Sequence, residues 1–202
     1  MKTLITILLL SILVSSNAQS VDTVIYMKGY TSYFNNQLHE PLYVTYKLYK
    51  GGGNCSRNKD KFETGGLAAS ATASDYEGHG YDEGHLANSK DFAYDCKLQE
   101  QTFRFYNCVP QTPKLNRGTW KVLETELRKE SQTDSLYIIA GSIFGNKKIG
   151  KAAVPDFCYK VVYSLSTKKI LYCRLYPNDN SDSFTDINLT QLKNKIAYRL
   201  VY

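Results

Sequence analysis

The sequence has little of what marks several common classes of protein. Beyond its first eighteen residues it contains no apolar run long enough to cross a membrane, no internal repeat and no low-complexity segment. None of its five cysteines shows the C-x-x-C spacing of a zinc site, and the run Gly51-Gly52-Gly53 lacks the Gly-Lys-Ser/Thr ending of a phosphate-binding loop. The residue order of an EF-hand and the H-E-x-x-H pattern are also missing. The chemistry must therefore be sought in other motifs.

The first residues have the pattern of a secretory signal peptide. Met1-Lys2 is followed by an apolar run from Leu4 to Val14, and small residues end the segment at Ser16-Asn17-Ala18. We expect cleavage after Ala18, and hence a secreted or periplasmic protein. Residues 19–202 have a length typical of one domain with a substantial core.

The charge balance is mildly basic. The formal net charge is +6 at pH 7, from 25 Lys and Arg against 19 Asp and Glu. This excess favours a polyanionic partner, although it does not establish one.

The cysteine count has consequences for an exported chain, in which disulfides can form. Five is an odd number, so at least one thiol stays unpaired within the chain. Cys158 and Cys173 flank a predicted hairpin that turns near Ser166-Thr167, which makes a cross-strand disulfide between them plausible. The other pairings stay open.

Segments rich in β-branched and aromatic residues alternate with polar stretches and predict β-strands. The predicted strands are Thr23–Lys28, Leu42–Tyr49, Gln101–Tyr106, Leu136–Ala140, Phe157–Leu165 and Lys169–Tyr176. Between the second and third of them, Cys55–Gly80 has little periodicity and is expected to be a long surface loop.

Two helices are expected. Thr119–Lys129 places Trp120, Leu123 and Leu127 on one side, and Asp186–Leu200 has an apolar stripe with Asp186 as its cap. Thr112–Gly118, before the first helix, is expected to be a turn. Strands grouped with few helices, rather than alternating with them, predict an α+β domain.

The motifs with the clearest chemistry lie in Tyr81–Glu124. Asp82-Glu83-Gly84-His85 opens this stretch, Asn107-Cys108-Val109-Pro110-Gln111 lies in its middle, and Leu115-Asn116-Arg117 leads to Trp120 and Glu124. The three elements resemble, in order and spacing, the Asp-Arg-Gly-His, Asn-x-x-Pro-Gln and Leu-Asn-x-x-x-Trp-x-x-x-Glu motifs of the DNA/RNA non-specific endonucleases. The resemblance is clear over residues 71–124, which is under half of the chain.

That resemblance implies a fold, a cofactor and a substrate. The fold would be the ββα-metal (His-Me finger) nuclease fold, with a central antiparallel sheet flanked by helices. The activity would be Mg²⁺-dependent hydrolysis of DNA and RNA with little sequence specificity, leaving 5′-phosphates, with Mn²⁺ as a substitute for Mg²⁺. The partners would be DNA and RNA, bound through the phosphate backbone; no membrane partner is expected, and no oligomeric state is specified.

Three residues would carry the reaction. A neutral imidazole at His85 can take a proton from attacking water, and by resemblance Asn116 would be the one direct metal ligand. Glu124 follows Asn116 by eight positions, about two helical turns, and would hold metal-bound waters. The alternatives without function are a histidine in a turn, an asparagine at a helix start and a solvated glutamate.

The supporting residues follow from the same resemblance. Asn107 could fix the geometry of the metal or of His85, and Asp82 could brace the glycine turn and orient His85. Arg57 could contact the scissile phosphate, although a plain surface arginine is almost as good an interpretation. Arg117 and Lys121 would follow the phosphate backbone of the substrate.

The sequence also departs from the family. Glu83 stands where the family has an arginine, and Glu77 where some relatives have one, so a carboxylate would lie near the substrate phosphate and repel it. This favours a second hypothesis: a non-catalytic member of the fold that binds nucleic acid or another exported partner. A third hypothesis is a structural calcium or zinc site formed by Asp82, His79 and His85.

Overall fold

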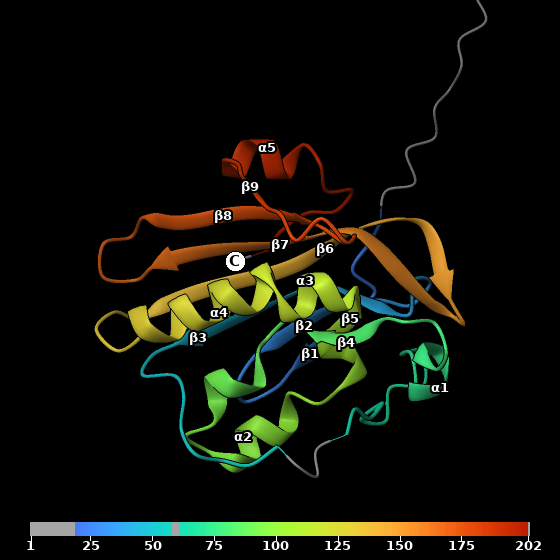
Figure 1. Ribbon diagram of the computed structural model, residues 1–202, viewed down its shortest axis with the longest axis horizontal. Helices are drawn as coiled ribbons and strands as arrows, with labels where there is room; N and C mark the ends of the chain where they lie inside the picture. Colours follow the sequence, from blue (N-terminus) through green and yellow to red (C-terminus); the bar gives the residue numbers. More distant parts are fainter. Residues whose placement is uncertain (1–18, 58–60, 202) are drawn as a thin grey trace, which may run out of the picture.

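The computed structural model describes residues 19–57 and 61–201. Its centre is a seven-stranded antiparallel sheet with the strand order β1-β2-β3-β6-β7-β8-β9 (Figure 1). The strands are β1 (Thr23–Tyr26), β2 (Thr31–Asn35), β3 (Glu40–Leu48), β6 (Leu136–Ile149), β7 (Ala152–Ser164), β8 (Ile170–Pro177) and β9 (Thr185–Asp186). A separate two-stranded hairpin pairs β4 (Asp82–His85) with β5 (Cys108–Gln111).

The helices are short except for one. They are α1 (Ala73–Tyr76), α2 (Cys96–Gln101), α3 (Pro113–Arg117), α4 (Thr119–Glu130) and α5 (Leu189–Lys193), with the 3₁₀ turns η1 (Ser89–Phe92) and η2 (Phe105–Asn107). Together with the sheet they form an α+β fold, as predicted.

Helix α4 forms because its apolar residues recur at helical spacing. Trp120, Leu123 and Leu127 are buried on one side of the helix. The Trp120 ring meets the Tyr176 ring of β8 edge-on, with centroids 5.3 Å apart, so this side of α4 packs on the sheet. The other sides of α4 therefore face the β4–β5 hairpin and solvent.

The C-terminal segment covers the other face of the sheet. Successive residues of a strand point to opposite faces, so Tyr159 of β7 points away from the α4 side, to which its neighbour Lys160 points. The Tyr159 hydroxyl lies 3.0 Å from that of Tyr198, whose single O–H is within hydrogen-bond distance of the carbonyl oxygens of Ser142, at 2.7 Å, and Leu42, at 3.0 Å. The long strands are thereby buried on both faces, and the hairpin and helices on the α4 side stand on a rigid base.

Most expected strands are confirmed, although several have different bounds. β1, β3, β6, β7 and β8 occupy the predicted segments. Gln101–Tyr106 is not a strand, because α2 ends at Gln101 and the η2 turn begins at Phe105. Strands β2, β4, β5 and β9 were not predicted.

Two other expectations about the helices are wrong. Thr112–Gly118 is not merely a turn: Thr112 caps helix α3 by accepting from the Leu115 N–H. The predicted helix Asp186–Leu200 shortens to α5, because Asp186 pairs with Arg174 in the sheet and Asn188 provides the cap instead.

The cysteines pair differently from the expectation. The structure has a disulfide between Cys55 and Cys96, and Cys108, Cys158 and Cys173 are buried free thiols. The expected Cys158–Cys173 bridge does not form, because β7 and β8 pair Cys158 with Tyr176 and Cys173 with Val161, so the two thiols are not opposite one another.

The predicted signal peptide, residues 1–18, lies outside the described residues. In the part of the chain that is described, no helix combines the length and the apolar character that crossing a bilayer requires.

Candidate active site

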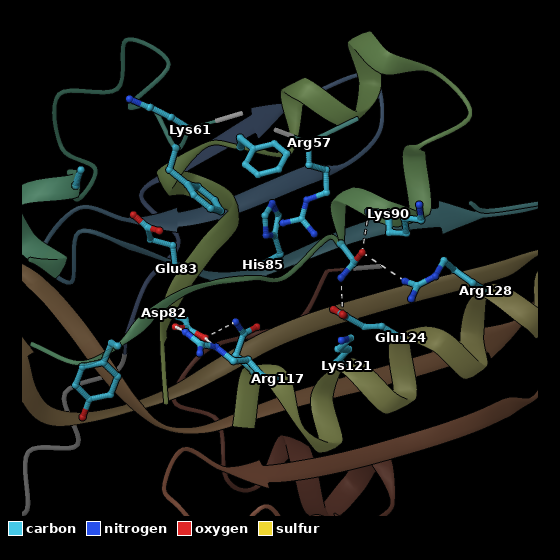
Figure 2. Close-up of a pocket in the computed structure, with 16 residues that line it drawn as sticks. Arg57, Lys61, Asp82, Glu83, His85, Lys90, Arg117, Lys121, Glu124 and Arg128 are labelled. Atoms are coloured by element: carbon cyan, nitrogen blue, oxygen red, sulfur yellow. Dashed lines mark hydrogen bonds and ion pairs between the residues drawn. The ribbon is translucent and has the colours of Figure 1, made fainter. Parts of the chain in front are cut away.

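The β4–β5 hairpin, α3, α4 and the segment around Arg57 enclose a cleft of about 880 Å³ (Figure 2). Its lining includes six basic side chains and three acidic ones. The basic residues are Arg57, Lys61, Lys90, Arg117, Lys121 and Arg128, and the acidic ones are Asp82, Glu83 and Glu124. This excess of positive charge suits a polyanionic ligand.

His85 lies in this cleft at the end of β4. Its ring is packed between two phenylalanines, with centroids 4.7 Å from Phe62 and 4.8 Å from Phe103, and only 8% of the residue is exposed. The indole N–H of Trp120 in α4 donates to the His85 carbonyl oxygen at 3.2 Å. The strand and the helix are therefore fixed to one another at the histidine.

Burial, together with the positive charges of Arg57 and Lys160, lowers the pKa of His85 from 6.5 to about 3. In Figure 2 the Arg57 guanidinium is directed toward the imidazole. The imidazole is therefore neutral at physiological pH and can accept a proton.

The neighbour of His85 Nε2 indicates which nitrogen accepts. Thr102 Oγ1 lies 3.5 Å from Nε2, and it donates its own proton to the Gln99 carbonyl oxygen at 2.7 Å. Toward the ring the hydroxyl oxygen is then placed to accept, which favours the tautomer with the hydrogen on Nε2. In that tautomer the lone pair of the neutral ring resides on Nδ1.

Gly84, next to His85, is needed for close packing rather than for a turn. The expected glycine turn is wrong, because residues 82–85 form strand β4. A Cβ at Gly84 would lie 2.2 Å from the side chain of buried Gln111 on the paired strand. The glycine therefore leaves room for the Gln111 side chain beside β4.

Asn116 is the penultimate residue of α3, with Gly118 separating that helix from α4. Its Nδ2 donates to Asp82 Oδ2 at 2.9 Å, which leaves the amide oxygen Oδ1 as the atom that can act as a ligand. The expectation that Asp82 orients His85 is wrong. Asp82 instead holds Asn116 and forms a paired hydrogen bond with the Arg117 guanidinium.

Glu124 is buried, only 3% exposed, and lies in the same cleft. Its Oε1 accepts from Lys160 Nζ at 3.0 Å, and its Oε2 accepts from the Asn88 amide. The interpretation as a solvated helix glutamate is therefore excluded. Asn116 and Glu124 both face the cleft as expected, although they belong to two helices rather than one.

Asn107 lies beneath the site rather than in it. It is fully buried, and its side chain bonds only to backbone: Nδ2 donates to the carbonyls of Ala87 and Thr102, and Oδ1 accepts from the Ala87 N–H. It therefore fixes the chain that follows His85, and it does not line the cleft.

The remaining predicted residues surround the cleft. Arg57 is exposed and lies over the Phe103 ring, with Cζ 5.3 Å from the centroid, and Lys121 is exposed on the first turn of α4. Glu83 lines the cleft, but in Figure 2 its carboxylate points away from His85. Burial, assisted by repulsion from Asp82, raises the pKa of Glu83.

Sequence reasoning missed three residues that hold the site together. Lys160 of β7 is fully buried and lies 4.3 Å from the Trp120 ring centroid. Asn88 contacts Glu124 and, through Oδ1, caps η1 by accepting from the Lys90 N–H. Arg128, one helical turn after Glu124, pairs with buried Asp91 at 2.9 Å. The capping role of Asn88 could have been predicted from the sequence, because an asparagine three residues before Asp91 is typical of a helix cap.

The donor set of the cleft fits Mg²⁺. This ion prefers oxygen ligands and keeps several of its waters. Asn116 Oδ1 supplies a neutral oxygen whose amide is already oriented by Asp82, and the Glu124 carboxylate is held by two donors. Asn116 would be the direct ligand, and Glu124 would hold the waters of the ion.

The hypothesis of a structural calcium or zinc site formed by Asp82, His79 and His85 is wrong. Within residues 19–57 and 61–201, no three His, Cys, Asp or Glu side chains are placed to hold a metal ion together. His79 is exposed, whereas His85 is buried in the cleft.

The fold and the arrangement of the cleft define a ββα-metal nuclease fold. A solved structure of endonuclease G in complex with EndoGI has the same fold, with a TM-score of 0.76 and 20% identity over 89% of this chain and 86% of that one.

Relatives with higher sequence identity are known. A nuclease of Nostoc sp. (strain PCC 7120 / SAG 25.82 / UTEX 2576) is 33% identical over 145 residues, which are 68% of this chain and 53% of that protein. Mitochondrial endonuclease G of Bos taurus is 37% identical over 75 residues, 37% of this chain and 25% of that protein. The chain thus spans about half or less of the length of these relatives.

The DNA/RNA non-specific endonuclease family matches residues 11–197, nearly the whole chain. The chain belongs to this family.

Proposed function

We propose that the protein is a Mg²⁺-dependent endonuclease that hydrolyses DNA and RNA with little sequence specificity and leaves 5′-phosphates. The observation that carries the proposal is the neutral, buried His85 in the same cleft as the oxygen donors Asn116 and Glu124. A general base beside a site for a hard cation is the combination that phosphodiester hydrolysis requires.

His85 is the proposed general base. Nδ1 of the neutral ring takes the proton from the water that attacks phosphorus, while the Nε2–H remains directed at the oxygen of the Thr102 hydroxyl. Phe62 and Phe103 hold the ring in place. The hydrogen bond from the Trp120 indole to the His85 carbonyl oxygen fixes the position of His85 relative to α4.

Mg²⁺ bound at Asn116 would stabilise negative charge on the phosphate and on the leaving oxygen. Asp82 orients the Asn116 amide so that its oxygen faces the ligand position. Lys160 and Asn88 occupy the two oxygens of Glu124 and hold its carboxylate in one orientation. These groups act on the residues that would hold the ion, as outer-shell partners do.

The basic rim would bind the phosphate backbone. Arg57 and Lys121 are exposed at the cleft, and charge contacts of this kind contain no information about base sequence. Arg117 is engaged with Asp82 and would brace this side of the cleft while remaining exposed. Little sequence specificity follows from such a rim.

The test is cleavage of supercoiled plasmid and single-stranded RNA, with Mg²⁺ or EDTA. We expect degradation with Mg²⁺ only, and a loss of about 10²- to 10⁴-fold in His85→Ala, the usual range for a general base. His79→Ala is the matched control, because His79 is exposed and outside the cleft lining. Full activity in His85→Ala would refute the assignment of the base.

A second function is favoured by Glu83, because its carboxylate lines the cleft and would repel a substrate phosphate. A non-catalytic protein of this fold would bind nucleic acid, or another exported partner, without hydrolysing it. Binding of a labelled oligonucleotide that persists in EDTA, with intact substrate under all divalent cations, would favour it. Glu83→Arg would then show whether the carboxylate is the cause.

We also propose that the protein is secreted or periplasmic after cleavage of residues 1–18. The Cys55–Cys96 disulfide supports export, because disulfides persist in oxidising compartments. Sequencing of the mature N-terminus tests this, with Gln19 as the expected first residue.

A further inference from the structure

The segment Gly51–Arg57, here named the Arg57 segment, leads from β3 to the cleft. It contains no helix or strand, and most of it is exposed. At its end Arg57 lines the cleft and is directed toward His85 (Figure 2). A side chain on such a segment needs an anchor if it is to bind one phosphate at one place.

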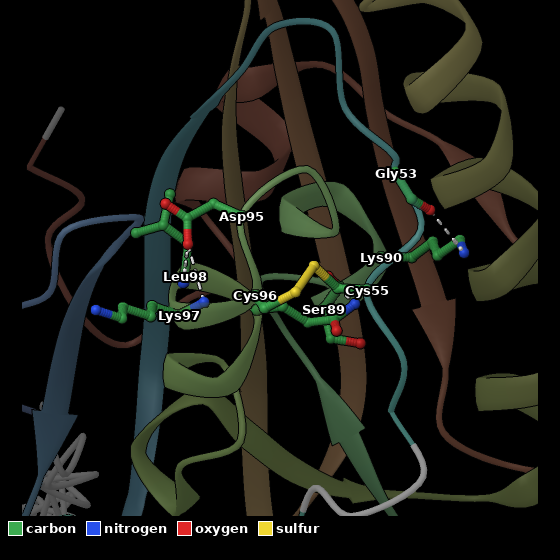
Figure 3. Close-up of a disulfide and its surroundings, with 9 residues drawn as sticks. Gly53, Cys55, Ser89, Lys90, Asp95, Cys96, Lys97 and Leu98 are labelled. Atoms are coloured by element: carbon green, nitrogen blue, oxygen red, sulfur yellow. Dashed lines mark hydrogen bonds between the residues drawn. A yellow bond between two sulfur atoms is a disulfide. The ribbon is translucent and has the colours of Figure 1, made fainter.

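The anchor is the Cys55–Cys96 disulfide, two residues before Arg57 (Figure 3). It ties the segment to the first residue of α2 across a Cα–Cα distance of 5.3 Å. The Cys55 N–H also donates to the Ala93 carbonyl at 3.2 Å, and Lys90 Nζ donates to the Gly53 carbonyl at 3.2 Å. All three contacts lie at or before Cys55.

Gly53 shows how closely the Arg57 segment approaches the chain between η1 and α2. Its φ is +128°, and a Cβ there would lie 2.2 Å from the Ala93 carbonyl oxygen. Only glycine can adopt this backbone so close to another chain segment. The segment therefore lies directly against Ala93 at Gly53, and the disulfide holds it there at Cys55.

The part of the chain to which the Arg57 segment is anchored, from η1 to α2, is itself connected to His85. Asp95 caps the start of α2, and Thr102, the C-terminal cap residue of the helix, contacts His85 Nε2. The Gln99 side chain donates to the Ser89 carbonyl and joins the two turns. The start of α2 holds the disulfide and its end meets the imidazole, so one short helix relates Arg57 to His85.

We propose that the Cys55–Cys96 disulfide is a positioning device that places the Arg57 guanidinium at the phosphate next to His85. This inference rests on the proposed function, in which Arg57 contacts the scissile phosphate. Arg57 is the group that touches substrate, and the disulfide acts through it. The bond thus contributes to the reaction and not only to the stability of the fold.

A double-mutant cycle tests the connection. Arg57→Ala should lower kcat/KM by about 10²-fold, as loss of one charge-stabilising donor does. Cys55→Ser/Cys96→Ser should lower it by about 10-fold, since a small misplacement of such a group is costly. In the Arg57→Ala background the serine pair should cost less than about twofold. An equal loss in both backgrounds would overturn the proposal.

A pair of insertions tests it with the disulfide intact, in case the serine variant fails to fold. Two glycines inserted between Ser56 and Arg57 release Arg57 from its anchor and should lower kcat/KM about as much as the serine pair does. The same insertion after Gly52 lies on the other side of the anchor and should leave kcat/KM within about twofold of wild type. Equal effects of the two insertions would contradict positioning by the disulfide.

Limited trypsin digestion separates failure of this proposal from failure of the proposed function. In folded protein, loss of the disulfide should speed cleavage after Arg57 by about 10-fold, because a released segment opens more often. An unchanged cleavage rate would refute the anchoring. A wild-type protein that cleaves no nucleic acid would refute the nuclease assignment, while this readout would still decide whether the bond holds Arg57.

Discussion

His85 can serve as a base because the protein keeps it neutral. Two phenylalanine rings and the strand remove it from water, and two cations lie near enough to oppose its protonation. A surface histidine with an ordinary pKa would be largely protonated in a mildly acidic medium. Burial therefore extends the working range of this residue to lower pH.

The first prediction follows from that pKa. Since protonation of His85 is shifted from 6.5 to about 3, kcat/KM should not show an acid limb near pH 6.5. Between these two pKa values the unfolded chain binds a proton that the folded chain does not, so the contribution of His85 to the free energy of unfolding, taken as the difference from His85→Ala, should fall as pH decreases. A pH–rate profile, with urea titrations at the same pH values, checks both; an acid limb at 6.5 would contradict the burial.

The second prediction concerns Lys160. Its ammonium and the Glu124 carboxylate form a buried pair, with 0% and 4% of the side chains exposed. Lys160→Met leaves the carboxylate without its cation and should destabilise the protein by about 3–5 kcal/mol. Urea unfolding measures this loss.

The control for Lys160 is the double variant Lys160→Met/Glu124→Gln. It removes both charges and should regain much of the stability, because the penalty arises from the unpaired carboxylate. Its activity should stay low, since we propose that the Glu124 carboxylate holds the waters of the metal ion. If Lys160→Met alone were as stable as wild type, the pair would have no structural role.

Among the elements, the junction between α3 and α4 decides where Asn116 lies. The two helices meet at Gly118, where a Cβ would lie 2.1 Å from Asp182 Oδ1 and 2.4 Å from the Lys114 carbonyl. Asp182 Oδ1 also accepts from the Thr119 N–H at the start of α4. The carboxylate cannot move away without releasing that helix end.

Gly118→Ala should therefore destabilise the protein by about 1–3 kcal/mol through overpacking. It should also lower activity, because α3 moves and takes Asn116 with it. Thermal unfolding and the Mg²⁺ concentration at half-maximal rate are the measurements. Lys129→Ala, an exposed change on α4, is the control; equal behaviour of the two variants would contradict the role of the junction.

Strand β3 holds a buried carboxyl with an unusual titration. Glu40 is fully buried; Tyr76 donates to its Oε1 at 3.4 Å, while Oε2 has no hydrogen-bond partner among the described residues. Burial raises the pKa of Glu40 well above 4.5. The folded chain then keeps a proton that the unfolded chain has released.

The contribution of Glu40 to the free energy of unfolding should consequently fall as pH rises above 4.5, by about 1.4 kcal/mol per pH unit while only the folded chain keeps the proton. Glu40→Gln removes the titration and should flatten this dependence between about pH 5 and pH 8. Urea midpoints at the two pH values measure it. An unchanged slope in the variant would show that Glu40 is ionised in the folded protein.

The elements that could be predicted from sequence are those with strong local patterns. Helix α4 and the long strands have regular spacing of apolar residues, and they were found. Strand β4 consists of Asp82-Glu83-Gly84-His85, which has low strand propensity and is held by its pairing with β5. The start of the predicted C-terminal helix was lost because Asp186 pairs with Arg174, a contact that local sequence does not reveal.

In the candidate active site, too, residues within sequence motifs could be predicted, whereas those placed by tertiary contacts could not. His85, Asn116 and Glu124 were predicted from motifs, and the structure brings them into one cleft. Lys160 could not be predicted, because a lysine in a strand gives no sign that it lies under a helix. Asp82 and Asn107 were assigned to the site, but their partners became clear only from the tertiary contacts.

For the whole molecule, the positive charge of the cleft should dominate substrate binding. Replacing Lys121 with alanine should weaken binding equally for all sequences and reduce the slope of log K against log[salt] by about 1. Lys195→Ala is the matched control, since Lys195 is exposed and away from the cleft lining. Binding titrations at several salt concentrations measure the slopes, and equal slopes for the two variants would contradict a phosphate contact at Lys121.

Trp120 is the only tryptophan of the chain, and it lies under the site. Its indole N–H bonds to the His85 carbonyl, and the Lys160 ammonium lies over its ring. The tryptophan fluorescence of the protein therefore comes from one residue, which lies beside both His85 and the buried Lys160 ammonium. Emission spectra can follow the active site through unfolding, ligand addition or mutation without any attached label.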